Sequence, residues 1–94
     1  MPILKIMGYQ YTITTPGDTD SIGGCGTCDS KMQKIQVASN LAPEQKQSTI
    51  LHESMEALNY HLQLGLKHET IMRLEAALFQ VLGDNGVDLS KLGE

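Results

Sequence analysis

The spacing of apolar residues predicts two helices in the second half of the chain. The first is expected over residues 43–64, because a rotation of about 100° per residue gathers its apolar side chains on one face. That face comprises Leu51, Met55, Leu58 and Leu62. The second is expected over residues 68–82, with an apolar face of Ile71, Leu74, Leu78, Val81 and Leu82. Pro43 suits a first helical turn, and Gly65 lies where the first helix should end.

The first third of the chain alternates polar and apolar residues, which is typical of strands. Strands are predicted within residues 1–14 and over residues 32–38, where Ile35 and Val37 share one face. Residues 15–31, rich in Gly, Asp and Ser, predict a loop or an irregular hairpin, and residues 86–94 a polar tail. The whole pattern predicts an α+β fold, with a small antiparallel sheet of two or three strands followed by two antiparallel helices.

Composition limits the class of protein. A chain of 94 residues is expected to form one small domain, spanning residues 1–94. Seven basic and eleven acidic residues, with no Lys/Arg cluster, argue against nucleic acid as a partner. No apolar run is long enough to cross a bilayer, and the first residues lack the apolar core of a signal peptide. We therefore expect a cytoplasmic protein that binds neither nucleic acid nor membrane.

The segment from His52 to Glu56 differs by one residue from the zinc-hydrolase motif H-E-x-x-H, with Glu56 in the place of the second histidine. Helix positions i and i+4 lie one above the other, so His52 and Glu56 can bind the same ion, and carboxylate oxygen is a good zinc ligand. Glu53 lies beside them, where the motif places the general base that activates a metal-bound water. The alternative is a solvated helix face, an interpretation that the neighbouring Asn59 and Gln63 also fit.

The predicted second helix carries two more ionisable residues on its apolar side. His68 and Glu75 are seven positions apart and therefore share a face. An unpaired charge on a buried face is costly, so both need partners, and His52 and Glu56 on the preceding helix are available. Together with His52 and Glu56, His68 and Glu75 therefore predict one metal site between two antiparallel helices. Taken singly, His68 could instead bond the backbone and Glu75 could pair with a lysine.

Two ring-bearing residues lie near the end of the predicted first helix, and only Tyr60 is a secondary candidate for the site. His61 lies opposite His52 on the helical wheel and is expected to face solvent. Tyr60 is nearer to Glu53, where its hydroxyl could donate a hydrogen bond to a developing oxyanion. The alternative for Tyr60 is a packed side chain with a hydrated hydroxyl.

Cys25 and Cys28 form a single C-x-x-C motif in the Gly-rich stretch. One such motif supplies half of a zinc site, so a structural site would need His52 and His68 to complete it. A redox role is typical of a C-x-x-C that opens a helix after a strand, and this motif lies in a predicted loop. Two ordinary thiols in a turn are the simplest interpretation.

With these residues in place, the chain resembles the small phage- and prophage-encoded zincin-like metallopeptidases related to the ImmA/IrrE type. The similarity covers most of residues 22–85 and is most specific in the helices. The matching segments there are residues 49–53, 56–60, 66–71, 74–75 and 78–82, ending in Asp84-Asn85. Before them, Cys28-Asp29 and residues 33–37 are similar to the hairpin strand of that family.

The resemblance implies a minimal zincin-like fold with Zn²⁺ held between the two helices. In that family both histidines of H-E-x-x-H bind zinc, and a carboxylate from the next helix completes the set. Here Glu56 replaces one histidine, and His68 would supply the missing nitrogen, which keeps an open position for catalysis. Glu75 would then be a fourth ligand, which would close the site and make it structural, or would hold His68 from outside the coordination shell.

We therefore expect a zinc-dependent hydrolase, most simply a small metallopeptidase acting on a peptide or protein, with Glu53 as general base. The alternative is a non-catalytic, metal-stabilised phage or prophage domain that acts through protein–protein contacts. In zincin folds an edge strand pairs with an extended substrate, and the strand over residues 32–38 is the expected one. A phage-encoded chain would act in the cytoplasm of the host cell.

Overall fold

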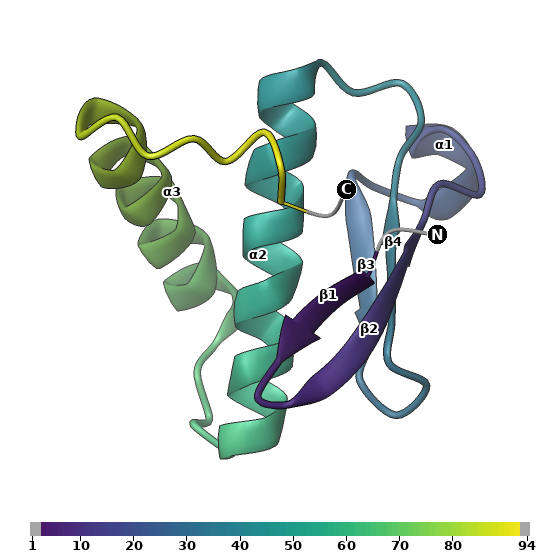
Figure 1. The fold of residues 1–94 in the computed structure, drawn as a ribbon. Helices are drawn as coiled ribbons and strands as arrows, with labels where there is room; N and C mark the ends of the chain where they lie inside the picture. Colours follow the sequence, from purple (N-terminus) through teal and green to yellow (C-terminus); the bar gives the residue numbers. More distant parts are fainter. Residues whose placement is uncertain (1–2, 93–94) are drawn as a thin grey trace.

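A computed structural model describes residues 3–92 and shows a four-stranded sheet followed by two long helices (Figure 1). The strands are β1 (Ile3–Ile6), β2 (Tyr9–Thr14), β3 (Gly26–Asp29) and β4 (Lys34–Val37). The helices are α1 (Thr19–Ile22), α2 (Pro43–Leu62) and α3 (His68–Asp84). The predicted α+β class is confirmed, and both long helices begin at the expected residue. Residues 1–2 and 93–94, at the ends of the first predicted strand region and the predicted tail, lie outside the described residues.

The strand order in the sheet is β1-β2-β4-β3. β1 and β2 form an antiparallel hairpin whose turn, Met7-Gly8, has positive φ at both residues, as a tight two-residue turn requires. β3 is antiparallel to β4, whereas β2 and β4 are parallel, with Ile13 opposite Ile35. The prediction of an antiparallel sheet of two or three strands was therefore wrong in both respects. The Gly-rich stretch contains a short helix and strand β3, and it carries the chain across so that β4 returns parallel to β2.

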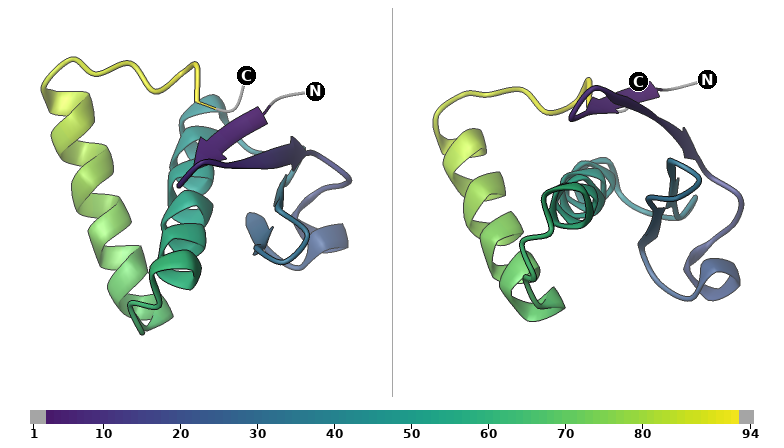
Figure 2. Two further views of the ribbon diagram at one scale, coloured as in Figure 1. Left: turned by 60° about the horizontal axis from the view of Figure 1, so that its bottom comes forward. Right: turned by 90° about the horizontal axis from the view of Figure 1, so that it is seen from below.

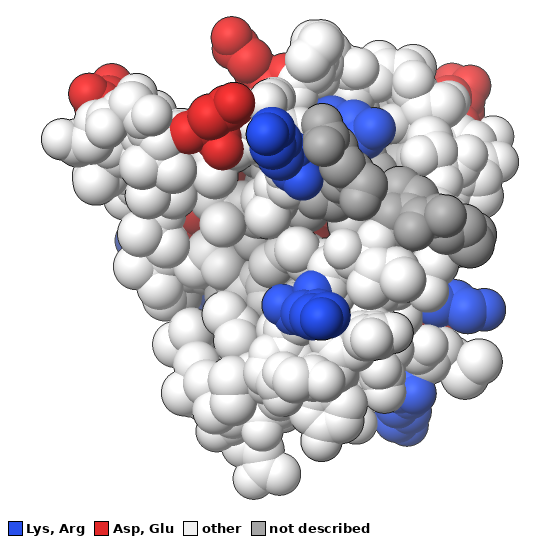
Figure 3. Space-filling model, viewed as in Figure 1, with Lys and Arg blue, Asp and Glu red and all other residues white. Residues whose placement is uncertain are grey.

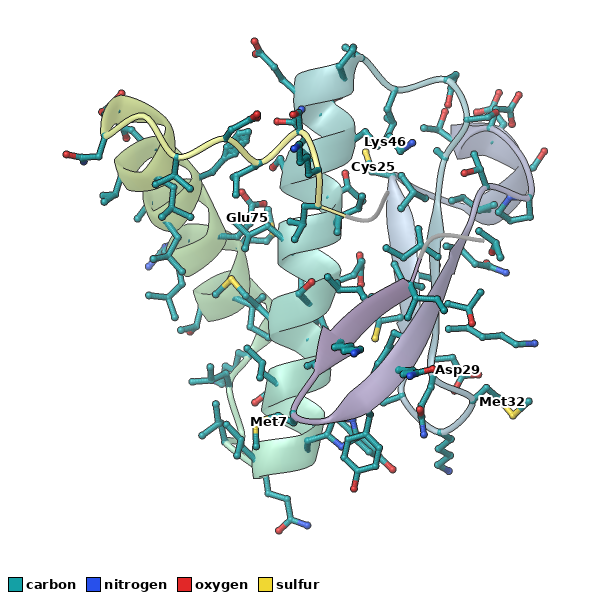
Figure 4. The ribbon with its side chains drawn as sticks, in the orientation of Figure 1. Met7, Cys25, Asp29, Met32, Lys46 and Glu75 are labelled. Atoms are coloured by element: carbon teal, nitrogen blue, oxygen red, sulfur yellow. The ribbon has the colours of Figure 1, made fainter. Side chains whose placement is uncertain are left out.

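The strand predicted over residues 32–38 is shorter and lies inside the sheet. Met32 belongs to the turn after β3, where Oδ1 of Asp29 accepts hydrogen bonds from the backbone N–H groups of Lys31 and Met32. Figure 4 shows the Met32 side chain directed away from the body of the protein. Because β4 has β2 on one side and β3 on the other, it offers no free edge. The prediction that this strand pairs with a substrate was wrong, and β1 and β3 are the edge strands of the sheet described here.

The elements form three layers, with α2 between the sheet and α3 (Figure 2). The core lies between α2 and the inner face of the sheet, where Ile35 and Val37 are fully buried as their shared face predicted. Its buried members are Ile6, Tyr11, Ile13, Ile35, Val37, Ile50 and Ala57. Within residues 3–92, α3 contacts α2 and none of the strands, and it buries only Ile71. Among the helices and strands of residues 3–92, α2 is therefore the one that α3 packs against.

The buried face of α2 differs from its predicted apolar face. The residues that it buries are Thr49, Ile50, Glu53 and Ala57, whereas Leu62 is 48% exposed. The apolar side chains of α2 point in several directions because the helix has neighbours on several sides. Leu58 packs at the edge of the core together with Leu92 from the tail, which crosses back over α2 (Figure 1). The polar tail thus contributes an apolar anchor that its composition did not indicate.

The charged side chains on the face seen in Figure 3 are dispersed. Acidic groups lie mainly along its upper rim, and the basic groups are scattered from the upper middle, beside acidic ones, to the centre and the lower right. Among the helices of residues 3–92, none combines the length and the apolar character needed to cross a membrane.

Gly26 allows α2 to lie close to β3. A Cβ atom at this position would lie 2.5 Å from Cγ2 of Thr49, 2.9 Å from the backbone oxygen of Gln36 and 3.3 Å from Oε2 of Glu53. Two of these atoms belong to α2, so any side chain on Gly26 would push the helix and strand apart. The glycine therefore sets the distance between the sheet and the face of α2 that carries Glu53.

We expect Gly26→Ala to destabilise the fold by about 1–3 kcal/mol, the usual cost of overpacking a close contact. The matched control is Gly83→Ala, because Gly83 lies in α3 with open space around its Cα, and this change should stabilise the protein by about 0.5–1 kcal/mol. Equilibrium unfolding in urea measures both. Equal stabilities for Gly26→Ala and the parent protein would contradict the close-packing argument.

Candidate metal centre

The three predicted ligands come together between α2 and α3. His52 and Glu56 are one turn apart on α2, and His68 is the first residue of α3. One donor atom from each residue lies within 4.8 Å of the other two. Oε2 of Glu56 is 3.6 Å from Nε2 of His52 and 3.2 Å from Nδ1 of His68. The two imidazole rings meet edge to face with their centroids 5.1 Å apart.

The spacing and chemistry of these donors fit Zn²⁺. Tetrahedral ligands at about 2.0–2.2 Å from zinc are separated from one another by about 3.3–3.6 Å. The two nitrogen atoms lie 3.6 and 3.2 Å from the Glu56 oxygen, close to that spacing, and all three donors lie within 4.8 Å of one another. Two imidazole nitrogens and one carboxylate are also a donor set found in catalytic zinc sites.

Asn59 fixes the connection that brings His68 to the cluster. Its side-chain oxygen accepts a hydrogen bond from the backbone N–H of Leu66 at 2.9 Å, and its amide nitrogen donates to the Leu66 carbonyl at 3.2 Å. The His68 side chain is 65% exposed, so this loop and the Glu56 contact are what hold it. The sequence placed Asn59 on the same helix face as His52 and Glu56, where it also fitted the alternative of a solvated face, but it gave Asn59 no role in the site.

Glu53 points from α2 toward the sheet and is only 7% exposed. A Cβ atom on Gly26 would lie 3.3 Å from its Oε2, so this oxygen is directed at β3. Burial raises the pKa of Glu53 to about 7, and the negative charge of Glu56 adds to the rise, while His68 acts in the opposite direction. The predicted general base is therefore a nearly buried carboxyl group beside the predicted ligands.

Two surface depressions meet at Glu53. One is lined by Cys28, Asp29, Ser30, Lys31, Glu53, Glu56, Asn59 and Tyr60. The other is lined by residues 23–26 and by Gln45, Ser48, Thr49, His52, Glu53, His68, Met72 and Glu75. Together they follow α2 and β3 on either side of the buried carboxyl group. Tyr60 lines the first depression together with Glu53. Its role as a hydrogen-bond donor in catalysis stays a prediction.

Glu75 approaches the cluster from α3 but contacts a different ring from the one expected. Its Oε1 lies 3.9 Å from Nδ1 of His52, and its Oε2 accepts a hydrogen bond of 3.0 Å from the hydroxyl of Ser48. Figure 4 shows the Glu75 side chain between α3 and α2. The partner is thus His52 rather than His68. Ser48 was not identified from sequence, although it stands one helical turn before His52.

His61 packs against the sheet, whereas it was predicted to face solvent. Its ring stacks on Tyr9, with centroids 4.4 Å apart, and its Nε2 forms a hydrogen bond with the hydroxyl of the buried Tyr11. The helical wheel correctly placed it away from His52. It could not show that the last turns of α2 lie against the β1–β2 hairpin, which covers that side of the helix.

Neither cysteine supplies a donor atom to the cluster of His52, Glu56 and His68. Cys25 is exposed just before β3, while Cys28 is half-buried within it, and the Sγ atom of Cys28 lies 3.6 Å from the hydroxyl oxygen of Ser30. Burial raises the pKa of the Cys28 thiol above its ordinary value. Within residues 3–92, neither thiol belongs to the group of donor atoms formed with His52 and His68. The alternative zinc site with two cysteines is therefore not assembled.

Comparisons of the chain with protein-family models, with curated proteins and with solved structures found no match. The chemistry of the cluster is therefore inferred from its geometry. Two nitrogen donors and one carboxylate meet on adjacent helices, with a nearly buried carboxyl group beside them.

The raised pKa of Glu53 predicts that the metal-free protein loses stability as the pH rises. The stabilising contribution of the protonated side chain is complete below the ordinary pKa of 4.5 and is lost as the pH rises through about 7. Glu53→Gln stays neutral, so at pH 8 it should unfold at least ~4 °C above the parent protein, which corresponds to about 1 kcal/mol. At pH 4.5 and below, the two proteins should differ much less.

Thermal unfolding in the presence of a chelator, followed by circular dichroism at both pH values, measures this difference. Glu44→Gln, the same chemical change at an exposed position in the first turn of α2, is the control and should show no such gain, because a negative charge is favourable there. A Glu53→Gln protein that is no more stable than the parent at pH 8 would refute the assignment of a destabilising buried carboxylate.

Proposed function

We propose that the protein is a zinc-dependent hydrolase, most simply a small metallopeptidase, with zinc bound by His52, Glu56 and His68. The observation that carries this proposal is the convergence of their three donor atoms within 4.8 Å, on two different helices, directly beside Glu53. The meeting of two histidines and one carboxylate beside a nearly buried carboxyl group supports this proposal over a solvated helix face. Glu53 is the general base of the proposed reaction.

Each residue has a defined task in this proposal. Bound zinc would supply Lewis acidity to polarise the scissile carbonyl and to acidify water. Glu53 accepts a proton from the attacking water on its carboxylate and returns it to the leaving amine, a role for which its position beside the ligands suits it. Tyr60, in the depression that also contains Glu53 and Glu56, is proposed to donate a hydrogen bond to the oxyanion.

The proposed substrate is an extended peptide or protein segment that pairs with β3. This strand is at the edge of the sheet, and its other side is paired with β4. The free backbone groups of an edge strand can add a further strand, and both depressions that meet at Glu53 are partly lined by residues of β3 or adjacent to it. We also propose the cytoplasm as the site of action, which the free thiols of Cys25 and Cys28 support.

A second candidate is a non-catalytic, metal-stabilised domain that acts through protein–protein interaction. The observation that favours it is the exposure of large apolar side chains along α3. Leu74 and Leu78 are 43% and 42% exposed, and Met72 and Val81 are 51% and 56% exposed. A helix with so much apolar surface open to solvent is typical of an interface. In this case the zinc cluster would serve to hold α3 on α2.

We expect the purified protein to contain one zinc ion, measured by mass spectrometry of metals against protein concentration. His52→Ala, Glu56→Ala and His68→Ala should each lose it, because three donors are the minimum for a zinc site in a protein. His61→Ala is the matched control, since His61 lies outside the cluster and should keep the metal. A metal-free parent protein that also fails to bind added zinc would exclude both candidate functions.

Glu53→Gln separates the two candidates. For a hydrolase, this variant should retain zinc and fold but lose cleavage of a peptide library by about 10²–10⁴-fold, the usual contribution of a general base. Asp84→Asn should cleave as the parent does. If the parent protein binds zinc and cleaves nothing, or if Glu53→Gln cleaves as fast as the parent, the catalytic assignment fails and the interaction domain is favoured.

A further inference from the structure

His52 is the member of the cluster that faces a carboxylate at each ring nitrogen. Its Nε2 lies 3.6 Å from Oε2 of Glu56, and its Nδ1 lies 3.9 Å from Oε1 of Glu75. The His52 and Glu75 side chains are largely buried, at 12% and 16% exposure. Only the first of these two carboxylates belongs to the group of three donors. The second therefore stands on the far side of the ring from the proposed metal.

Glu75 is itself held by a separate contact. Its other oxygen, Oε2, accepts a hydrogen bond of 3.0 Å from the hydroxyl of Ser48. Ser48 and His52 are four positions apart on α2 and so lie on the same side of that helix. Glu75 reaches this side from α3, as Figure 4 shows. The chain of contacts runs from Ser48 to Glu75 to His52, and it joins the two helices that supply the three donors.

The orientation of a histidine ligand depends on the nitrogen that does not bind the metal. A neutral imidazole carries one proton, and the group that accepts it decides which nitrogen keeps a free lone pair. A carboxylate at Nδ1 holds the proton there and leaves Nε2 of His52 available, on the side where Glu56 and His68 lie. At 3.9 Å the two atoms form an ion-pair contact, and a movement of roughly 1 Å would bring them to a hydrogen bond of about 2.7–3.2 Å.

We propose that Glu75 is a positioning residue of the zinc site, which acts through Nδ1 of His52 and is anchored by Ser48, and that it is not a fourth ligand. This inference rests on the proposed function, because it assigns the orientation of a ligand of that site. It leaves the fourth position of the zinc open for water and substrate. It also makes α3 contribute twice to the centre, once through His68 and once through Glu75.

Zinc affinity, measured by competition with a chromophoric chelator, tests the proposal independently of activity. Glu75→Ala should weaken zinc binding by about 10- to 100-fold, the usual effect of removing a group that orients a ligand. Glu75→Gln should lose less, because its amide oxygen can still accept the Nδ1 proton. Ser48→Ala should weaken binding in the same direction by a smaller factor. Asp84→Ala, which removes an exposed acid elsewhere on α3, should bind as the parent does.

A double mutant tests whether Ser48 acts through Glu75. If it does, the protein with both Ser48→Ala and Glu75→Ala should bind zinc as weakly as Glu75→Ala alone, because the anchor has nothing left to hold. Cobalt in place of zinc then reports on coordination. The visible absorption of the cobalt protein should keep its intensity in Glu75→Ala, since the number of protein ligands is unchanged. Far-ultraviolet circular dichroism of each metal-free variant establishes that it is folded.

Three results would overturn the proposal. They are unchanged zinc affinity in a folded Glu75→Ala, fully additive losses from the two substitutions, and a cobalt spectrum that shows a lost ligand. Each requires a parent protein that binds zinc, so they are distinguishable from failure of the proposed function. A parent protein that binds no zinc would instead remove the site itself, and with it the role of Glu75.

Discussion

The contact between α2 and β3 at Gly26 determines where the candidate site can lie. With no side chain on Gly26, Thr49 and Glu53 of α2 approach the edge strand directly. This approach buries the Glu53 carboxyl group and raises its pKa to about 7. It also turns His52 and Glu56, the neighbours of Glu53 along the helix, toward α3. The proposed metal-binding face and the proton-accepting group thus lie on adjacent faces of one helix whose position a glycine sets.

This arrangement places a destabilising group where the proposed chemistry needs it. A buried carboxylate near another negative charge opposes folding above its ordinary pKa, and a core of this size has little stability to spare. The buried Glu53 carboxyl group therefore lowers stability for the sake of the proposed chemistry. Because the chain is small, the sheet and α2 hold almost the whole core that must offset this cost. A cation bound between Glu56 and the two histidines would offset the repulsion between the Glu53 and Glu56 carboxylates. Such an ion would therefore stabilise the fold as well as the proposed reaction.

Local patterns in the sequence were sufficient for the helices and for the three donors. Periodicity located both helices, and the four-residue spacing of His52 and Glu56 placed them on one face, opposite His68. What could not be predicted depends on contacts between distant segments. β3 has only four residues and begins with a glycine, and the parallel pairing of β2 with β4 follows from a crossover that leaves no periodic signal. His61 shows the same limit, because its neighbours Tyr9 and Tyr11 come from the other end of the chain.

The contact between α3 and α2 links the fold to the candidate site. α3 buries Ile71 alone and leaves several large apolar residues open, so hydrophobic packing holds it weakly. Polar contacts add to this weak packing. Asn59 fixes the loop before α3, and Glu56 contacts His68. Glu75 contacts both Ser48 and His52. All of these links converge on the side of α2 that carries the proposed ligands. A metal at this position would close the same interface, so metal binding and the docking of α3 should be thermodynamically coupled. His68, the first residue of α3, is the group through which this coupling would act, because a metal bound to it would tie α3 to α2 where the apolar contact is weak.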